Sequence, residues 1–295
     1  MRLIELAKRG LHGRALAGLM LTALVALSTS AEAGAGRAKL LAAKSWAFQL
    51  QNVNVGRLAA SPYDVLVVDF SHSGSNRSAL SRADVARLKN GGRHVVLAYL
   101  SIGEAESYRD YWNKGGSKHA IGGSKGWKGN YTAKYWSDGW KDIMFRGSSS
   151  YLARIQAAGF DGVYLDRIDA HEKAGSRAQM IQLVREVSST AKSRDGSFLV
   201  LAQNAEELLD NASYRAAIDG IGKEELLYGI GGAGKPNTPG AISYSTKMLQ
   251  RLKSEGKAVM VIEYLNDGTK IASARQRLQS LGFVPFFGTR ALNRL

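Results

Sequence analysis

The chain has 295 residues, with 40 lysines and arginines against 25 aspartates and glutamates, and its formal net charge is +15. It contains no cysteine, which excludes a disulfide framework and a cysteine-linked lipid anchor. The basic residues are scattered and match no nucleic-acid-binding motif. We therefore expect no nucleic-acid partner, and the charge favours association with an anionic cell envelope.

The N-terminus is typical of an export signal. Basic residues from Arg2 to Arg14 precede the apolar run Ala15–Leu27, and Ala31-Glu32-Ala33 supplies the small-x-small pattern of a cleavage site. The run is too short for a membrane span, which needs about 20 residues. We predict a signal peptide over residues 1–33, cleavage after Ala33, and a secreted or periplasmic protein with no integral span. The remainder, 34–295, suits one (β/α)8 barrel of about 250 residues.

Short apolar runs recur along this remainder, as parallel strands buried on both faces require. Helix signals separate most of them, including a capping box at Ser81–Asp84 and apolar faces at Met180–Val187 and Met248–Leu252. The alternation predicts an α/β fold, a single (β/α)8 TIM-type barrel, with an open doubly wound sheet as the alternative. The expected strands are Trp46–Gln51, Val65–Phe70, His94–Leu100, Gly162–Leu165, Phe198–Ala202, Ala217–Ile221, Ala258–Ile262 and Phe283–Phe287.

One connection is unusually long: residues 101–150 precede an expected helix at Tyr151–Ala158. Loops of this length are usually functional or disordered, and the density of aromatic residues argues against disorder here. Aromatic faces suit the C–H faces of sugars, although the same rings would equally pack the loop onto the barrel. The aromatic residues are Tyr108, Tyr111, Trp112, Trp127, Tyr131, Tyr135, Trp136 and Trp140.

Four carboxylates close four expected strands with the inward parity of a barrel: Asp69, Asp166, Glu224 (if its strand continues past Ile221) and Glu263. Any one of them could instead cap the following helix. Two carboxylates across a cleft are what glycoside hydrolysis requires, one at the anomeric carbon and one that protonates the leaving oxygen.

Neighbouring acids receive other expectations. Asp161 precedes its strand and should bond backbone at the bottom of the barrel. Asp169 should be a helix cap or a support for Asp166, and Glu225 has the parity of a solvated or paired residue. Glu104 and Glu106 lie after strand three, where substrate contact and solvation are equally compatible with the sequence.

The chain resembles glycoside hydrolase family 114, which contains endo-α-1,4-polygalactosaminidases, over nearly all of its mature length. The resemblance is carried by YLSIGEAESYRDYW (Tyr99–Trp112), GFDGVYLDRIDAHE (Gly159–Glu172), LAQNAEELL (Leu201–Leu209), DGIGKEELLY (Asp219–Tyr228) and VIEYLN (Val261–Asn266).

The resemblance implies a (β/α)8 fold and a polysaccharide substrate containing α-linked amino sugar. It makes Asp166 the nucleophile and Glu224 the general acid/base of a retaining mechanism. Arg167 departs from the asparagine that the fungal enzymes tend to carry, which weakens transfer of the substrate. The substrate contacts that we expect are Asp69, Tyr99, Glu104, Gln203, Asn204, Glu263, Trp112 and Trp136.

Two other functions stay open. A noncatalytic barrel would keep the groove without turnover. A metal-dependent hydrolase would use Asp69, Asp166, Asp169 and His171, but the histidines show no ligand spacing. We therefore expect no metal and no cofactor at the site.

Overall fold

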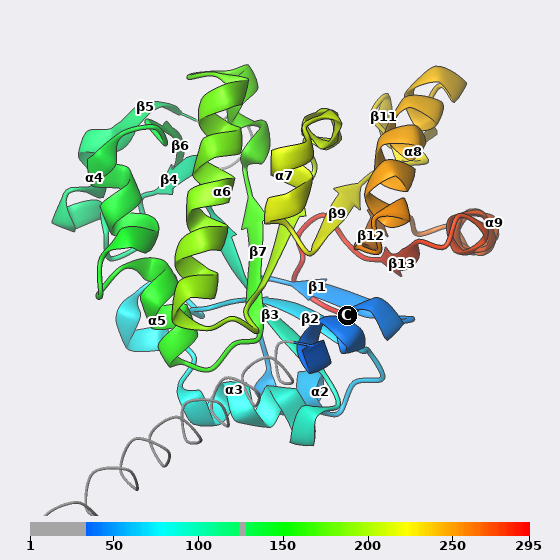
Figure 1. Ribbon diagram of the computed structural model, residues 1–295. Coiled ribbons are helices and arrows are strands. Elements are labelled where there is room, and N and C mark those ends of the chain that lie inside the picture. Colours follow the sequence, from blue (N-terminus) through cyan, green and yellow to red (C-terminus); the bar gives the residue numbers. More distant parts are fainter. Residues whose placement is uncertain (1–33, 124–127) are drawn as a thin grey trace, which may run out of the picture.

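The computed structural model describes residues 34–123 and 128–295, and the predicted signal peptide lies outside them. Its centre is a sheet of eight parallel strands that follow one another in chain order (Figure 1). Each strand pairs with the one before it in the sheet. The strands are β1 (Trp46–Gln49), β2 (Val65–Asp69), β3 (Val95–Ser101), β7 (Gly162–Asp166), β8 (Leu199–Gln203), β9 (Gly220–Glu224), β12 (Ala258–Glu263) and β13 (Val284–Phe287).

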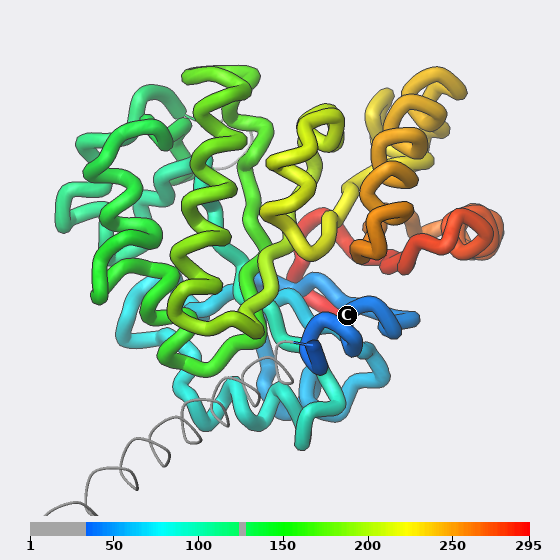
Figure 2. Tube along the Cα trace, in the orientation of Figure 1, coloured from blue at the N-terminus to red at the C-terminus, as the bar shows by residue number. Residues whose placement is uncertain are grey.

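Helices connect these strands and pack around the outside of the sheet (Figure 2), which confirms the predicted (β/α)8 barrel. No helix in the described ranges is long and apolar enough to cross a bilayer. The helices are α2 (Val55–Ala59), α3 (Arg82–Lys89), α4 (Asp138–Lys141), α5 (Tyr151–Ala157), α6 (Arg177–Arg194), α7 (Ala212–Ala217), α8 (Pro239–Ser254) and α9 (Gly268–Ser280).

Local signals place these elements. Ser81 and Asp84 form the predicted capping box at α3, and the apolar face predicted at Met180–Val187 is buried in α6. The expected strand from Ala217 starts late, because α7, capped by the Asn211 side chain, runs up to Ala217. β9 therefore extends from Gly220 to Glu224, which brings Glu224 to the strand end.

The barrel interior is rich in aromatic side chains. Trp46 is fully buried, with its ring centroid 6.1 Å from Phe48 and 5.7 Å from Phe286. Phe48 in turn lies 5.2 Å from the ring of Tyr164 and 6.4 Å from that of Tyr99. These rings fill the interior of the barrel. The side chains of Tyr99 and Tyr164 are therefore supported by packed aromatic neighbours.

β1 and β13 form the seam of the barrel. The indole N–H of Trp46 donates to the Val284 carbonyl at 2.9 Å, but the described residues of the two strands form no backbone ladder. The C-terminal segment, residues 288–295, covers the seam. Its Leu292 carbonyl accepts hydrogen bonds from Leu50 N at 2.8 Å and Gln51 N at 3.0 Å. The sheet is therefore closed by side chains and this segment.

Aspartates join neighbouring strands at the opposite end of the barrel. Asp161 accepts a hydrogen bond from Val96 N at 2.8 Å, as the sequence predicts. Asp219 does the same for Val200 N at 2.9 Å, and Asp64 for Ser45 N at 3.0 Å. The N-terminal end of the barrel thus uses its carboxylates for structure.

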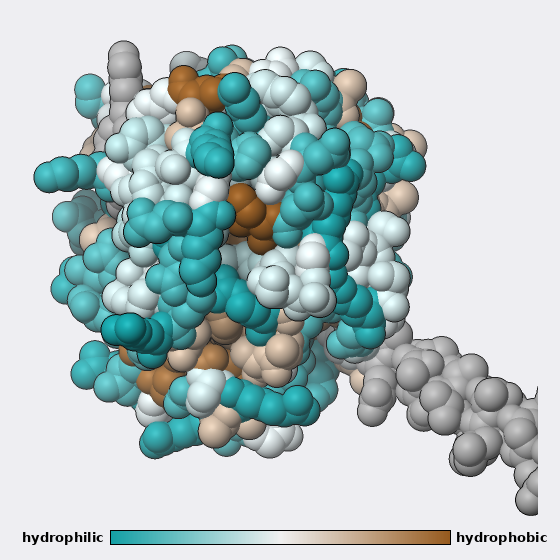
Figure 3. All heavy atoms as spheres, turned by 90° about the vertical axis from the view of Figure 1, so that its left-hand side faces the viewer, coloured by the Kyte–Doolittle hydropathy of each residue, from teal (hydrophilic) through white to brown (hydrophobic). Residues whose placement is uncertain are grey.

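Over its described residues, the long connection after β3 is a folded insertion. It holds a three-stranded sheet of β4 (Glu104–Glu106), β6 (Asn130–Ala133) and β5 (Ala120–Gly123), followed by α4 and a π-helical turn at Asp142–Arg146. Trp140 is fully buried and donates to the Ile102 carbonyl at 2.8 Å. The face turned to the viewer in Figure 3 is largely hydrophilic, with small separate apolar areas. Several aromatic rings of the insertion pack inward, since Tyr111, Tyr135 and Trp140 are buried.

Replacing Gly222 by alanine should destabilise the barrel. A Cβ there would lie 1.7 Å from Tyr164 Oη, inside a fully packed interior, and overpacking typically costs about 1–3 kcal/mol. The free energy of unfolding in denaturant checks this loss. Gly196→Ala is the control, because nothing lies within 4 Å of a Cβ at that position. Equal stability of the two variants would contradict the expectation.

Candidate active site

A cavity of about 710 Å³ lies at the carboxyl ends of the strands, the end at which barrel enzymes place their chemistry. Its wall combines strand ends with the first residues of the following loops and with the C-terminal segment. Seven of the ten site residues predicted from the sequence line it: Asp69, Tyr99, Glu104, Asp166, Gln203, Asn204 and Glu224.

Asp166 is the last residue of β7, beside Ser101 of β3. Tyr99 Oη donates a hydrogen bond to its Oδ2 at 2.6 Å. Burial raises the pKa of Asp166 to about 7, against the hydrogen bond from Tyr99, which lowers it. The negative charge of Glu224 raises it further. A group that would be ionised in water therefore carries a proton over part of the neutral range.

Glu224 ends β9 and is held on three sides. Asn204 Nδ2 donates to its carboxylate at 2.8 Å, while the Glu224 backbone N–H donates to Asn204 Oδ1 at 2.9 Å. The Tyr264 hydroxyl donates to the other carboxylate oxygen. Asn204 adopts φ +55°, a conformation that asparagine tolerates better than most residues. The orientation of Glu224 is thus fixed by its neighbours.

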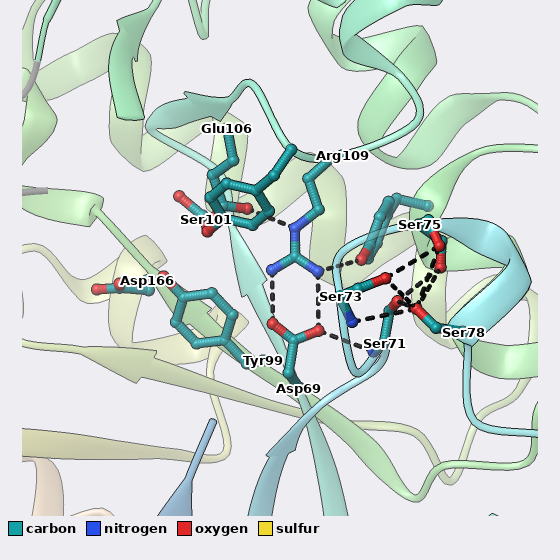
Figure 4. Close-up of polar contacts among 12 residues, drawn as sticks. Asp69, Ser71, Ser73, Ser75, Ser78, Tyr99, Ser101, Glu106, Arg109 and Asp166 are labelled. Carbon is teal, nitrogen blue, oxygen red and sulfur yellow. Dashed lines mark hydrogen bonds and ion pairs between the residues drawn. The ribbon is translucent and has the colours of Figure 1, made fainter. Parts of the chain in front are cut away.

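Asp69, at the end of β2, is paired with a buried arginine. Arg109 Nη1 and Nη2 donate to its two carboxylate oxygens at 2.8 and 2.6 Å. The same guanidinium donates from Nε to Glu106 at 2.8 Å and from Nη1 to the Tyr151 hydroxyl at 2.7 Å. Figure 4 shows Arg109 between the two acids, beside the pair formed by Tyr99 and Asp166. Asp69 therefore ties the insertion to the barrel.

A second arginine lies next to Asp166. Arg167 adopts φ +61°, a strained conformation for a long side chain. Its guanidinium is 3.0 Å from Glu104, which is 1% exposed, and 3.6 Å from Asp169. Asp169 thus contacts Arg167 and lines the cavity; it lies in the first turn of a short helix at Ile168–Glu172, and Arg167 is the N-cap of that helix.

The loop after β2 supplies neutral polar groups to the rim. Ser71 Oγ donates to the Ser75 carbonyl at 2.6 Å and shares a hydrogen bond with Ser78 Oγ at 2.8 Å. Figure 4 shows these hydroxyls gathered beside Asp69. Ser71 and Ser73 line the cavity. Their loop is held by its own side chains, so it offers hydroxyl and amide groups at fixed positions.

The structure does not bring Glu263 to the cavity, and the expectation of a sugar contact there is wrong. Glu263 is fully buried and accepts hydrogen bonds from Leu227 N at 2.7 Å and Tyr228 N at 3.3 Å. Burial raises its pKa to about 7. Its carboxylate holds the loop after β9, and the next residue, Tyr264, lines the cavity in its place.

Trp112 and Trp136 also lie outside the cavity lining. Their rings pack against neighbours in the insertion, Trp112 at 4.8 Å from Tyr131 and Trp136 at 5.0 Å from Tyr135. Among the aromatic residues of the insertion that the structure describes, Tyr108 lines the cavity and is 45% exposed. Trp127 lies outside the described residues.

Sequence reasoning missed Arg109, Tyr264 and Arg290. Arg290 lines the cavity and pairs with Glu225, for which the sequence left solvation and pairing open. Tyr264 follows a strand-end glutamate, and this adjacency was the only local signal for it. Nothing in the sequence near Arg109 indicates that it pairs with an acid 40 positions away.

Two of the four residues suggested for a metal-dependent hydrolase are not placed to bind a metal ion in the cavity. Both oxygens of Asp69 accept hydrogen bonds from Arg109. His171 faces Glu207 at 3.3 Å and does not line the cavity. The geometry therefore favours two carboxylates, Asp166 and Glu224, as the reactive groups of a glycoside-hydrolase barrel.

Comparison with known proteins also indicates a glycoside-hydrolase barrel. The family model described as Glycoside-hydrolase family GH114 matches residues 27–295, and the chain belongs to this family; it is a glycoside hydrolase. An uncharacterised protein of Deinococcus radiodurans is 34% identical over 268 residues, covering 87% of this chain and 83% of the relative. One from Methanocaldococcus jannaschii is 32% identical over 265 residues, covering 82% and 74%.

Two solved structures share the fold at low identity. The glycoside hydrolase domain of PelA from Pseudomonas aeruginosa has a TM-score of 0.69 at 19% identity, covering 86% of this chain and 97% of that domain. Aspergillus fumigatus Ega3, solved in complex with galactosamine, has a TM-score of 0.66 at 17% identity, covering 85% and 92%. Both support the barrel architecture.

Replacing Arg109 by methionine should destabilise the protein by about 3–5 kcal/mol, because two buried carboxylates would lose their shared cation. The free energy of unfolding measures the effect. Arg146→Met is the matched control: its partners Asp138 and Glu186 are also two acids, but its side chain is 37% exposed. The control should lose less than about 1 kcal/mol. Similar losses in both variants would show that the Arg109 pairs contribute no more than surface pairs.

Proposed function

We propose that this protein is a secreted hydrolase that cleaves α-linked, amino-sugar-containing polysaccharide by a retaining mechanism. The observation that carries the proposal is that Asp166 and Glu224 end two strands at one cavity, each fixed by a tyrosine hydroxyl. Two carboxylates held in this way suit the nucleophile and the acid/base of a glycosidase.

In the first step, Asp166 in its ionised form attacks the anomeric carbon while Glu224, which holds the one proton of the pair in the substrate complex, donates it to the leaving glycosidic oxygen. The C–O bond of the substrate breaks, and a glycosyl ester forms on Asp166. In the second step, Glu224 takes a proton from water, the water oxygen attacks the anomeric carbon, and the Asp166 ester bond breaks. Asn204 and Tyr264 keep Glu224 in position through both steps.

The charge of the cavity supports a cationic amino sugar. Six acidic side chains line it against three lysines and arginines, although the whole chain is strongly basic. An ammonium group near Asp166 would lower the pKa of its carboxyl and favour the ionised, nucleophilic form. The galactosamine bound to Ega3, a protein of the same fold, is a sugar of this class.

Export is part of the proposal because of the N-terminal pattern. The run Ala15–Leu27 and the site at Ala31–Ala33 support cleavage after Ala33. A polysaccharide substrate is consistent with that location, where extracellular matrix and envelope polymers are found. The positive surface charge would favour contact with anionic envelope.

Asp166→Asn and Glu224→Gln should each lower the rate of polysaccharide cleavage by about 10²-fold or more, since each removes one of the two reacting carboxyl groups. Mass spectrometry of products from galactosamine, glucosamine and neutral polysaccharides measures cleavage, and NMR of the first-formed anomer reports retention.

Asp138→Asn and Glu255→Gln are matched controls in surface ion pairs and should cleave at the wild-type rate. Catalytic variants as fast as these controls would refute the assignment. Cleavage of neutral glucans alone would refute the amino-sugar substrate. Binding without any product from the wild type would favour a noncatalytic barrel.

Activity should fall as the pH rises above about 7, because the pair formed by Asp166 and Glu224 then loses the one proton that the general acid needs. Tyr99→Phe removes a hydrogen bond that stabilises the Asp166 carboxylate and so raises the pKa of Asp166, which should move this limb of kcat/KM up by about one pH unit. Tyr135→Phe is the control, since that hydroxyl bonds the Ala174 carbonyl. An unmoved limb in Tyr99→Phe would contradict the role given to Tyr99.

A further inference from the structure

Three potential metal ligands meet beside the active site without lining it. His171 and Glu172 end the short helix at Ile168–Glu172 after β7, and Glu207 lies in the one at Glu206–Asp210 after β8. Because β7 and β8 are paired parallel strands, the segments after them are neighbours. One ligand atom from each of the three side chains lies within 4.8 Å of the others.

The tautomer of His171 is set by its surroundings. Its Nδ1 is 2.9 Å from the Ile168 carbonyl, which can only accept a hydrogen bond, so Nδ1 carries the proton. With its proton at Nδ1, the ring directs Nε2 toward Glu207. The His171 side chain is 8% exposed, and Nε2 lies 3.3 Å from Glu207 Oε1. At this distance the nitrogen and the carboxylate oxygen can share one cation, a proton or a metal ion.

Glu207 Oε1 is shielded from solvent and has no hydrogen-bond partner in the part of the chain that the structure describes. Within the same ranges, no lysine or arginine forms an ion pair with Glu207 or Glu172. The adjacent Glu206, by contrast, is paired with Lys223 at 3.1 Å. Among the described residues, Glu207 therefore has no lysine or arginine to balance its shielded carboxylate oxygen, while Glu172 reaches the cluster from the solvent side.

A zinc-class ion satisfies these groups. Nitrogen and oxygen ligands lie about 2.0–2.2 Å from zinc, so two ligands at a tetrahedral angle are about 3.3–3.5 Å apart. The separation of His171 Nε2 and Glu207 Oε1 is 3.3 Å. A ligating histidine usually donates its other N–H to a carbonyl or carboxylate, as His171 does to Ile168. The imidazole favours zinc over calcium or magnesium.

We propose that His171, Glu172 and Glu207 bind one divalent transition-metal ion of the zinc class, with water at the remaining position. None of the three lines the cavity, so the ion has a structural role. It links the segment that follows Asp166, the last residue of β7, to the segment that begins with Asn204 after β8, and holds these two strand ends together.

The test uses purified, untagged protein freed of metal with EDTA. Titration with ZnCl2 in a calorimeter should give one site per chain, and zinc should raise the Tm by roughly 5 °C or more. Calcium and magnesium should bind at least about 100-fold more weakly. His171→Ala should weaken zinc binding by about 100-fold or more, and so should the isosteric Glu207→Gln, which keeps the shape of the site.

His119→Ala is the matched control, because His119 is another partly buried histidine that bonds Ser137 Oγ. It should bind zinc as wild type does. The proposal fails if wild type shows no one-site binding, or if His171→Ala and Glu207→Gln bind zinc as tightly as the control. It also fails if ¹⁵N NMR shows a doubly protonated His171 ring that persists after zinc is added, since the cluster would then be an ion pair.

Discussion

The cavity depends on one buried cation, the guanidinium of Arg109. It neutralises Asp69 at the end of β2 and Glu106 in the insertion through three hydrogen bonds of 2.6 to 2.8 Å. Without that charge, two buried carboxylates would lose the cation that they share. The same contacts fix the insertion against the barrel. A single residue outside the strands thus sets both the shape and the charge of the cavity.

The other acidic residues at the strand ends and in the cavity wall have different roles. Glu104 is paired with Arg167, and Glu263 bonds backbone. Asp166 and Glu224 are different, because neutral donors rather than lysine or arginine hold their carboxylates most closely. A carboxyl group held by neutral donors can change its protonation state during a reaction at lower cost than one in an ion pair.

Much of the fold could be predicted from the sequence, because buried parallel strands and capped helices leave local patterns. The inward parity of Asp166 and Glu224 follows from the same regularity. The parity argument failed at Glu263, the last residue of β12. Its carboxylate bonds the loop after β9, and Tyr264 reaches the cavity instead. Arg109 could not be found, since its pairing with Asp69 depends on how a fifty-residue insertion folds back. Tertiary contacts of this kind have no local signature.

The seam between β1 and β13 links closure of the barrel to occupancy of the cavity. Phe48 and Leu50 line the cavity from the β1 side, and Arg290 and Leu292 line it from the C-terminal side. A ligand that contacted both sides would stabilise the closed arrangement of the seam. By reciprocity, a substitution that loosened the seam would weaken the binding of such a ligand by the same factor. The C-terminal segment would thus contribute to ligand affinity, although it supplies no carboxylate side chain to the cavity.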